Sequence, residues 1–245
     1  MPSLDACLVC VKSYDLEDLA QKLNPVVSDT TEVVPVLNGI DIRDRIRKKL
    51  PGATIYPACV FIGTHIEEPG VVSQDGGACR ILFGKASPEM GKDASVMAEV
   101  FDKSLIKSEW HDDIVPSLWT KYIFIAPFSL VTACYDKTLG QVMESEELSS
   151  LVRALMNEVL ALAAAQHIPL PASIIEDSYR KANDFPSGTK TSFQRDYEVP
   201  DRPDERDLFG GAIIRLGKRL DIATPCASGV SEMINKKKKP MTRRS

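Results

Sequence analysis

The chain opens with an alternation of strands and helices, and this pattern restricts the fold more than any other feature. "DACLVCVK" is a continuous apolar run, typical of a parallel strand that is covered on both faces. "SYDLEDLAQKL" follows it with leucines at helical spacing. "TEVVPVLNG" indicates a second strand that ends in Asn38-Gly39, and "DIRDRIRKKL" indicates a charged helix with one apolar side. Strand, helix, strand, helix predicts an α/β sheet.

The pattern changes in the middle of the chain. "TIYPACVFIGTHI", "GVVSQ" and "CRILFG" predict consecutive strands, before a helix in "SVMAEVFDKSL" and a short strand in "IKSEWHDD". After Asp113 almost every segment is helical in pattern. We therefore predict two domains, a Rossmann-type α/β part in residues 1–112 and an all-helical part in residues 113–245.

Two of the predicted helices carry further local signals. "SEELSSLVRALMNEVLALAAAQ" has a clean apolar stripe, with Ser145 as the candidate N-cap. "ERDLFGGAIIRLGKRL" has acidic residues at its start and basic residues at its end, which matches the helix dipole. Gly210-Gly211 in this segment predicts close helix packing, because glycine inside a helix otherwise costs about 1 kcal/mol.

The composition is that of an ordinary soluble globular protein. Of 245 residues, 44% are apolar and 26% charged, and the net charge of −4 gives no reason to expect a nucleic-acid partner. "KKKKPMTRR" near the end indicates a solvated tail, or alternatively a patch for nucleic acid or anionic lipid. The fourteen-residue run "YIFIAPFSLVTACY" is too short to span a bilayer and predicts a buried core helix. No secretory signal is apparent, so we expect a cytoplasmic protein without a membrane partner.

Six scattered cysteines predict buried free thiols rather than disulfides. Cys7 and Cys10 form a C-x-x-C pair, but residues three apart in a strand point to opposite faces. There is no second pair and the three histidines are far apart, so we expect no metal site.

An α/β sheet joined to a helical part is a common plan for nicotinamide-dependent enzymes. Its fingerprint, a glycine loop that lets a pyrophosphate approach the backbone, is not in the sequence, since no Gly-x-Gly occurs at all. There is no Walker loop either.

Several polar residues lie where a binding or catalytic residue could be expected, and each of them also has an interpretation without a function. Lys12 follows the first strand, where ligands bind in open sheets, or it simply leaves the strand for water. Asn38-Gly39 ends the second strand, in the same kind of location, but Asn-Gly is also a common turn dipeptide. Lys121 lies among large apolar residues, either with its head group in water or as a partly desolvated acid–base group. Ser192 is a candidate helix cap or surface hydroxyl, and Glu205 belongs to an acidic helix start.

Taken in order, these segments resemble the ketopantoate reductase (2-dehydropantoate 2-reductase) family. The matching pieces are "LVCVKSYD", "VVPVLNGID", "EPGVVSQDGGACRILFG", "DDIVPSLWTKYIFIAPFSLVTA" and "TKTSFQRDYEVPDRPDERDLFGGAIIRLGKRLDIATP". The resemblance implies a Rossmann domain followed by a helical domain, and reduction of 2-dehydropantoate to pantoate with NADPH in pantothenate and coenzyme A biosynthesis. It also implies that the first three strands and first two helices of the family's Rossmann domain, with its glycine loop, are lacking here.

The resemblance assigns roles to individual residues. Lys121 corresponds to the catalytic proton donor. Lys12, Asn38, Ile66 and Glu205 correspond to positions that contact the cofactor. Substrate contacts fall on Asn38, Ser192 and Ser129.

The chain departs from the family at two of these places. Where some members carry asparagines that hold the substrate, this chain has Ile125 and Ser129. We therefore keep three hypotheses: a ketopantoate reductase that could form homodimers, a reductase of a related 2-keto acid, and a non-catalytic fragment that folds or dimerises through its helical part.

Overall fold

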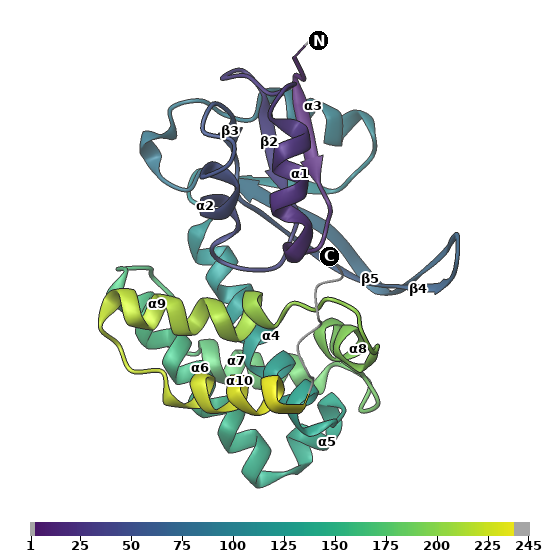
Figure 1. Ribbon diagram of the computed structural model, residues 1–245, viewed down its shortest axis with the longest axis vertical. Helices are drawn as coiled ribbons and strands as arrows, with labels where there is room; N and C mark the ends of the chain where they lie inside the picture. The colour runs from purple at the N-terminus through teal and green to yellow at the C-terminus, as the bar shows by residue number, and fades with distance from the viewer. Residues whose placement is uncertain (1–2, 238–245) are drawn as a thin grey trace. The chain divides into compact units, whose positions relative to one another are not determined.

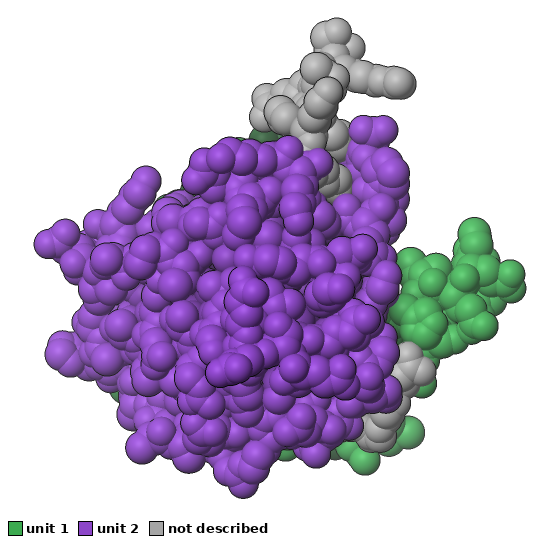
Figure 2. Space-filling model, turned by 90° about the horizontal axis from the view of Figure 1, so that it is seen from below, with its two compact units in different colours: residues 1–118 green, residues 119–245 purple. Residues whose placement is uncertain are grey.

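The computed structural model describes residues 3–237, without the side chains of residues 75–78. The chain divides into two compact units, residues 1–118 and residues 119–245 (Figure 2). The division falls inside one long helix. The boundary predicted near residue 112 from the change of sequence pattern remains a prediction.

Unit 1 begins with a small parallel sheet whose strand order is β1-β2-β3 (Figure 1). The helices α1 and α2 connect its strands. The bounds are β1 Ala6–Val9, α1 Leu16–Leu23, β2 Glu32–Pro35, α2 Ile42–Arg47 and β3 Thr54–Ile55. In the register of the first pair, Ala6 lies opposite Glu32 and Val9 opposite Pro35. The predicted alternation of strand and helix is therefore confirmed.

The second sheet of unit 1 has the order β4-β5-β6, with β4 antiparallel and β6 parallel to β5. Its strands are β4 Ala58–Glu68, β5 Val71–Gly84 and β6 Ser108–His111, and α3 Ser95–Lys103 precedes β6. The two strands predicted in "GVVSQ" and "CRILFG" are a single strand, because β5 stays paired with β4 across an irregular register. Phe83, Phe101 and Tyr56 pack in the core beneath this sheet.

The first strand differs from its prediction in burial. Val9 is 2% exposed, but Leu8 is 39% exposed and the two preceding side chains are half-buried. The physical reason is the strand order. In the part of the chain that the structure describes, β1 pairs with β2 alone, whereas β2 is central and buried along its whole length. Coverage on both faces, which was predicted for the first strand, is therefore wrong for β1.

Unit 2 is helical throughout the described residues. Its helices are α4 Val115–Tyr135, α5 Leu139–Glu144, α6 Glu146–Ala165, α7 Ile174–Asn183, α8 Ser192–Glu198, α9 Ala212–Leu220 and α10 Pro225–Lys237. The Ser145 hydroxyl accepts a hydrogen bond from the Leu148 N–H, which confirms the predicted N-cap of α6. The fold class, an α/β part followed by a helical part, is confirmed.

The helix predicted in "ERDLFGGAIIRLGKRL" is not uniform. Residues Asp207–Gly211 form a π-helical turn that leads directly into α9. Gly210 lies against α10 and Leu130, so closely that a Cβ atom at this position would overlap the Ser231 hydroxyl. The predicted close packing at this glycine is confirmed.

All six cysteines are free thiols, as predicted, but not all are buried. Cys59 and Cys134 are buried, whereas Cys10 and Cys79 are exposed. Cys10 lies just past the end of an edge strand, and Cys79 lies where the register of β4 and β5 is irregular. At neither position does another described helix or strand cover the thiol.

Two described helices, α4 and α6, are long and apolar enough to cross a membrane by length and composition alone. In α4, 72% of the apolar window is buried inside the protein. Burial of this extent agrees with the predicted core helix. The basic segment "KKKKPMTRR" extends from Lys236 to residue 244, and all but its first two lysines lie outside the described residues.

Candidate functional site

Lys12 and Asn38 occupy equivalent positions on neighbouring parallel strands. Each lies three residues beyond the paired ends Val9 and Pro35. The Val36 N–H donates to the Val9 carbonyl (3.0 Å), and this hydrogen bond holds the ends of the two strands side by side. Because parallel strands end at the same edge of a sheet, both half-buried side chains belong to the edge where ligands bind in open α/β folds.

The turn after Asn38 has a conformation that favours glycine. Gly39 has φ of 114°, in the region that other residues rarely adopt. The chain can therefore turn tightly from Asn38 toward α2. The Lys12 ammonium and the Asn38 amide can hydrogen-bond to the amide and hydroxyl groups of a nicotinamide cofactor. No glycine-rich loop for the pyrophosphate of such a cofactor occurs in the sequence.

Ile66 lies in a different part of unit 1. It is on β4, opposite Val72, and 71% exposed. Figure 1 shows the far end of the β4–β5 hairpin extending away from the rest of the unit. The β4–β5–β6 sheet is separate from the sheet that carries Lys12 and Asn38. A cofactor contact at Ile66 remains a prediction.

One face of α4 carries two of the candidate residues of unit 2, Lys121 and Ser129, with Ile125 between them. Lys121, Ile125 and Ser129 are spaced by four residues, so they lie on the same side of the helix. Lys121 and Ile125 are half-buried, whereas Ser129 is 3% exposed. The face thus runs from a charged end to a buried hydroxyl, with an aliphatic side chain between them.

Ser192 is tied to α4 by a pair of threonines. The Thr132 and Thr191 hydroxyls are hydrogen-bonded to each other (2.9 Å), and the Thr132 hydroxyl also donates to the Ser129 carbonyl (3.3 Å). Thr191 is the N-cap of α8 and accepts from the Gln194 N–H. Ser192 is therefore the first residue of α8 rather than its cap, and it lies one residue from a direct link to α4.

Glu205 is buried, at 3% exposure, immediately before the π-helical turn. Its carbonyl accepts from the N–H groups of Leu208 (2.9 Å) and Phe209 (3.2 Å). The hydroxyl of Tyr122, the residue after Lys121, donates to the carbonyls of the same two residues at 3.0 and 2.8 Å. These bonds connect the Glu205 backbone with the turn of α4 that carries Lys121.

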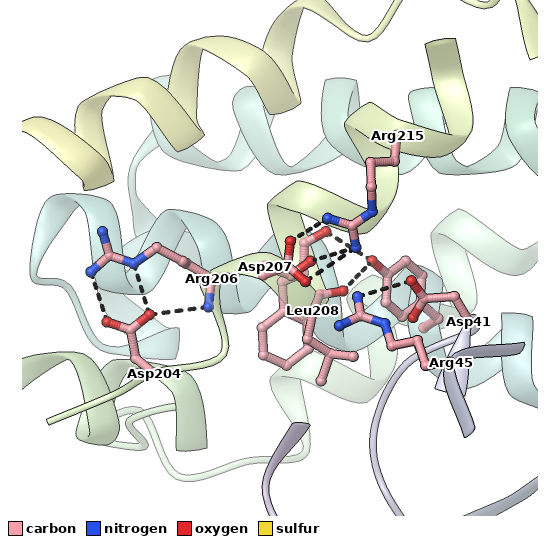
Figure 3. Close-up of polar contacts among 9 residues, drawn as sticks. Asp41, Arg45, Asp204, Arg206, Asp207, Leu208 and Arg215 are labelled. Carbon is pink, nitrogen blue, oxygen red and sulfur yellow. Dashed lines mark hydrogen bonds and ion pairs between the residues drawn. The ribbon is translucent and has the colours of Figure 1, made fainter. Parts of the chain in front are cut away.

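The acidic residues beside Glu205 have structural partners (Figure 3). Asp204 accepts two hydrogen bonds of 2.8 Å from the Arg206 guanidinium, and these bonds raise the pKa of Arg206. Asp207 pairs with Arg215. Both carboxylates are therefore engaged in ion pairs that support the start of the π-helical turn.

Sequence reasoning missed three features of these units. Thr191 could have been recognised, because a threonine three residues before Gln194 is a capping signal. Nothing in the sequence pattern marked Tyr122 as the donor to a π-helical turn. Nor did it mark Glu32, whose carboxylate accepts from the Val96 and Met97 N–H groups and caps α3.

An α/β unit with polar groups at its strand ends, followed by a helical unit with a half-buried lysine, is a plan common among two-part nicotinamide-dependent oxidoreductases. Two family models match the chain: "Ketopantoate reductase PanE/ApbA" over residues 1–88, and "Ketopantoate reductase PanE/ApbA C terminal" over residues 113–238. The chain belongs to the ketopantoate reductase family, which confirms the family predicted from the sequence.

Individual relatives are distant in sequence but similar in fold. The 2-dehydropantoate 2-reductase of Streptococcus pyogenes serotype M6 is 23% identical, over 95% of this chain and 76% of its own length. A PanE/ApbA family ketopantoate reductase from Ralstonia eutropha superposes with a TM-score of 0.84 at 24% identity, over 96% of this chain and 76% of that one. A D-mandelate dehydrogenase with NADH and anilino(oxo)acetate gives 0.85 at 24% identity, over 97% and 77%. The chain thus spans about three quarters of each relative.

Proposed function

We propose that the protein is an NADPH-dependent reductase that converts 2-dehydropantoate to (R)-pantoate, on the route to pantothenate and coenzyme A, in the cytoplasm. Membership of the ketopantoate reductase family over both parts of the chain carries this proposal. Lys121, Ser129 and Ser192, linked through α4 and Thr132, are the proposed catalytic and substrate-binding groups. A homodimer is proposed as well, since a relative from Staphylococcus aureus is described as dimeric.

The proposed chemistry follows from the kind of residue at position 121. NADPH, when bound, would supply a hydride to the ketone carbon. Negative charge then develops on the ketone oxygen, where the Lys121 ammonium would stabilise it and donate a proton. The half-buried position of Lys121 on an apolar helix favours this role, because an ammonium stabilises a developing negative charge more strongly where water is partly excluded.

Cofactor contacts are proposed for Lys12, Asn38, Ile66 and Glu205, with Asn38 also contacting the substrate. Lys12 and Asn38 support this assignment by their equivalent places at the strand ends. Since the sequence contains no glycine-rich phosphate loop, we expect NADPH to bind more weakly than to a Rossmann enzyme that has one.

The test is oxidation of NADPH by the 245-residue chain, followed by absorbance, with and without 2-dehydropantoate. We expect turnover only when the keto acid is present, and a loss of at least about 100-fold in kcat for Lys121→Ala. Lys137→Ala, a lysine just after the end of the same helix, is the matched control and should keep its activity. A chain that does not bind NADPH in a fluorescence titration would contradict the enzymatic function and favour a non-catalytic role.

A second candidate function is reduction of a more apolar 2-keto acid. Ile125 favours it, because an aliphatic side chain one helical turn from Lys121 offers no hydrogen bond to a substrate hydroxyl. The structural similarity to a D-mandelate dehydrogenase extends to the fold only. Comparing kcat/KM for 2-dehydropantoate and for benzoylformate separates the two candidates. Ile125→Asn should then shift the ratio toward 2-dehydropantoate.

A further inference from the structure

Arg43, in the first turn of α2, has a half-buried side chain and no carboxylate within hydrogen-bond distance among the described residues. Its side chain is 23% exposed, and its Nε atom is buried with no hydrogen-bond partner among the residues that the structure describes. The nearest carboxylate oxygen recorded for it belongs to Asp44, at 3.8 Å, which is beyond hydrogen-bond distance. Asp44 is itself 53% exposed, so water screens this pair.

The neighbouring arginines of α2 are in a different situation. Arg45 forms an ion pair of 2.9 Å with Asp41 (Figure 3), and Arg47 is 60% exposed and reaches water. For Arg43, burial lowers the pKa, and the charge of Arg47 lowers it further. A partly buried and poorly paired cation is stabilised when an anion joins it, because the anion replaces the water that the cation has lost.

The location of Arg43 indicates where such an anion would come from. α2 starts directly after the Asn38-Gly39 turn, at the end of unit 1 toward which β1 and β2 run (Figure 1). Lys12 lies at the same edge, three residues beyond the end of β1. Two cationic residues therefore follow the ends of neighbouring strands, at the edge of a parallel sheet where ligands bind.

We propose that Arg43 binds an oxyanion, and that Arg43 and Lys12 form an oxyanion site at the carboxyl ends of β1 and β2. A guanidinium suits this task, because its planar N–H groups can donate two parallel hydrogen bonds to a phosphate or a carboxylate. The oxyanion is either a phosphate group of the cofactor or the carboxylate of the keto acid. The choice between these two sources of the oxyanion rests on the proposed function, whereas the oxyanion site itself does not.

The site itself is tested with inorganic pyrophosphate, by calorimetric titration of the wild type, Arg43→Ala, Arg43→Lys and the matched control Arg47→Ala. We expect binding to the wild type and to Arg47→Ala, and a dissociation constant about tenfold or more higher for Arg43→Ala. Arg43→Lys should bind with intermediate affinity. If the wild type does not bind pyrophosphate, or if Arg43→Ala binds it as well as Arg47→Ala does, the proposal is wrong.

Thermal unfolding without ligand separates a binding role from a structural one. Removing a poorly paired, desolvated charge should leave the midpoint of Arg43→Ala unchanged or raise it, whereas a large decrease would indicate a structural role and overturn the proposal.

The origin of the oxyanion is identified by two further measurements on Arg43→Ala. Weaker binding of both NADPH and NADH assigns the site to a cofactor phosphate, and a raised KM for the keto acid with unchanged cofactor binding assigns it to the carboxylate. If the chain binds pyrophosphate through Arg43 but binds neither dinucleotide nor keto acid, the proposed function fails and the oxyanion site stands.

Discussion

At the scale of single residues, Tyr56 shows how burial changes a titration. Its side chain is 1% exposed and its hydroxyl donates to the Lys92 carbonyl (3.2 Å). Burial, with smaller contributions from the Glu32 and Asp93 charges, raises the pKa of Tyr56 to about 12. The folded state therefore holds this proton more tightly than the unfolded state does.

We expect Tyr56 to make unit 1 sensitive to alkali. Because the pKa of Tyr56 is raised in the folded state, the contribution of this residue to the free energy of unfolding is fully present below pH 10.0. It is lost as the pH rises toward about 12. The loss amounts to about 3 kcal/mol. Urea unfolding of the wild type and Tyr56→Phe at a series of pH values measures it. The variant should be less stable at neutral pH, and the difference should shrink above pH 10.0. A constant difference would contradict the prediction.

Gly210 illustrates a constraint that comes from packing alone. A Cβ atom there would overlap the Ser231 hydroxyl and press against Leu130. We expect Gly210→Ala to lower the free energy of unfolding by about 1–3 kcal/mol, as overpacking does. The matched control is Gly229→Ala in α10, where nothing lies within 4 Å of the added methyl. This control should be neutral or stabilising by up to about 1 kcal/mol, since alanine favours helices. Equal effects in chemical denaturation would contradict the packing argument.

At the scale of elements, two buried glutamates cap helices that are distant in sequence. Glu32 of β2 caps α3, and Glu158 of α6 accepts from the Cys226 and Ala227 N–H groups at the start of α10. The first N–H groups of a helix have no partner within it, so such carboxylates join one element to the next. Each cap fixes where its helix starts relative to the element that supplies it.

Loss of the Glu158 cap should destabilise unit 2. We expect Glu158→Ala to lower the free energy of unfolding by about 1–3 kcal/mol, because one buried and one part-buried N–H group lose their acceptor. Glu147→Ala, which removes an exposed carboxylate from the first turn of the same helix, is the control and should change little. Hydrogen exchange of the Cys226 and Ala227 amides should become faster only in Glu158→Ala.

Most of the elements were predictable, because each leaves a periodic signal in its own residues. The Ser145 cap and the apolar stripe of α6 are local features of this kind. The π-helical turn was not predictable, because it depends on a hydroxyl of α4 and on close packing against α10. The partial exposure of β1 was missed for a related reason, since burial depends on strand order rather than on composition.

The candidate site was less predictable than the fold. The positions of Lys12 and Asn38 at strand ends follow from the sequence, but their equivalent register does not. Ser192 was assigned through family resemblance, whereas its attachment to α4 through Thr132 and Thr191 required coordinates. Arg43 gave no signal, because an arginine in a charged helix looks the same whether or not it is paired.

At the scale of the whole molecule, each unit contains one tryptophan. Trp110 packs against Tyr56 and Phe83 in unit 1, and Trp119 lies in unit 2, at 4% exposure, 6.5 Å from the Tyr122 ring. Single-tryptophan variants made with Trp110→Phe or Trp119→Phe therefore report on the two units separately.

We expect changes inside unit 2 to affect the Trp119 signal more than the Trp110 signal. Adding Glu158→Ala to each single-tryptophan variant should lower the urea midpoint reported by Trp119. It should lower the midpoint reported by Trp110 less, because the core around Phe83 is formed within unit 1. Equal shifts of both midpoints would show that the chain unfolds as one cooperative unit.

The π-helical turn at Asp207–Gly211 also bears on how this segment changes over evolution. A π-helical turn holds one residue more than an α-helical turn, so deleting a single residue would restore an α-helix. The residues from Ala212 to Leu220 would then keep their orientation, because the wide turn is what absorbs the additional residue. A deletion inside α9 would instead rotate every later residue of the helix by about 100°. We therefore expect the segment to tolerate the loss of one residue within the π-helical turn better than the loss of one within α9.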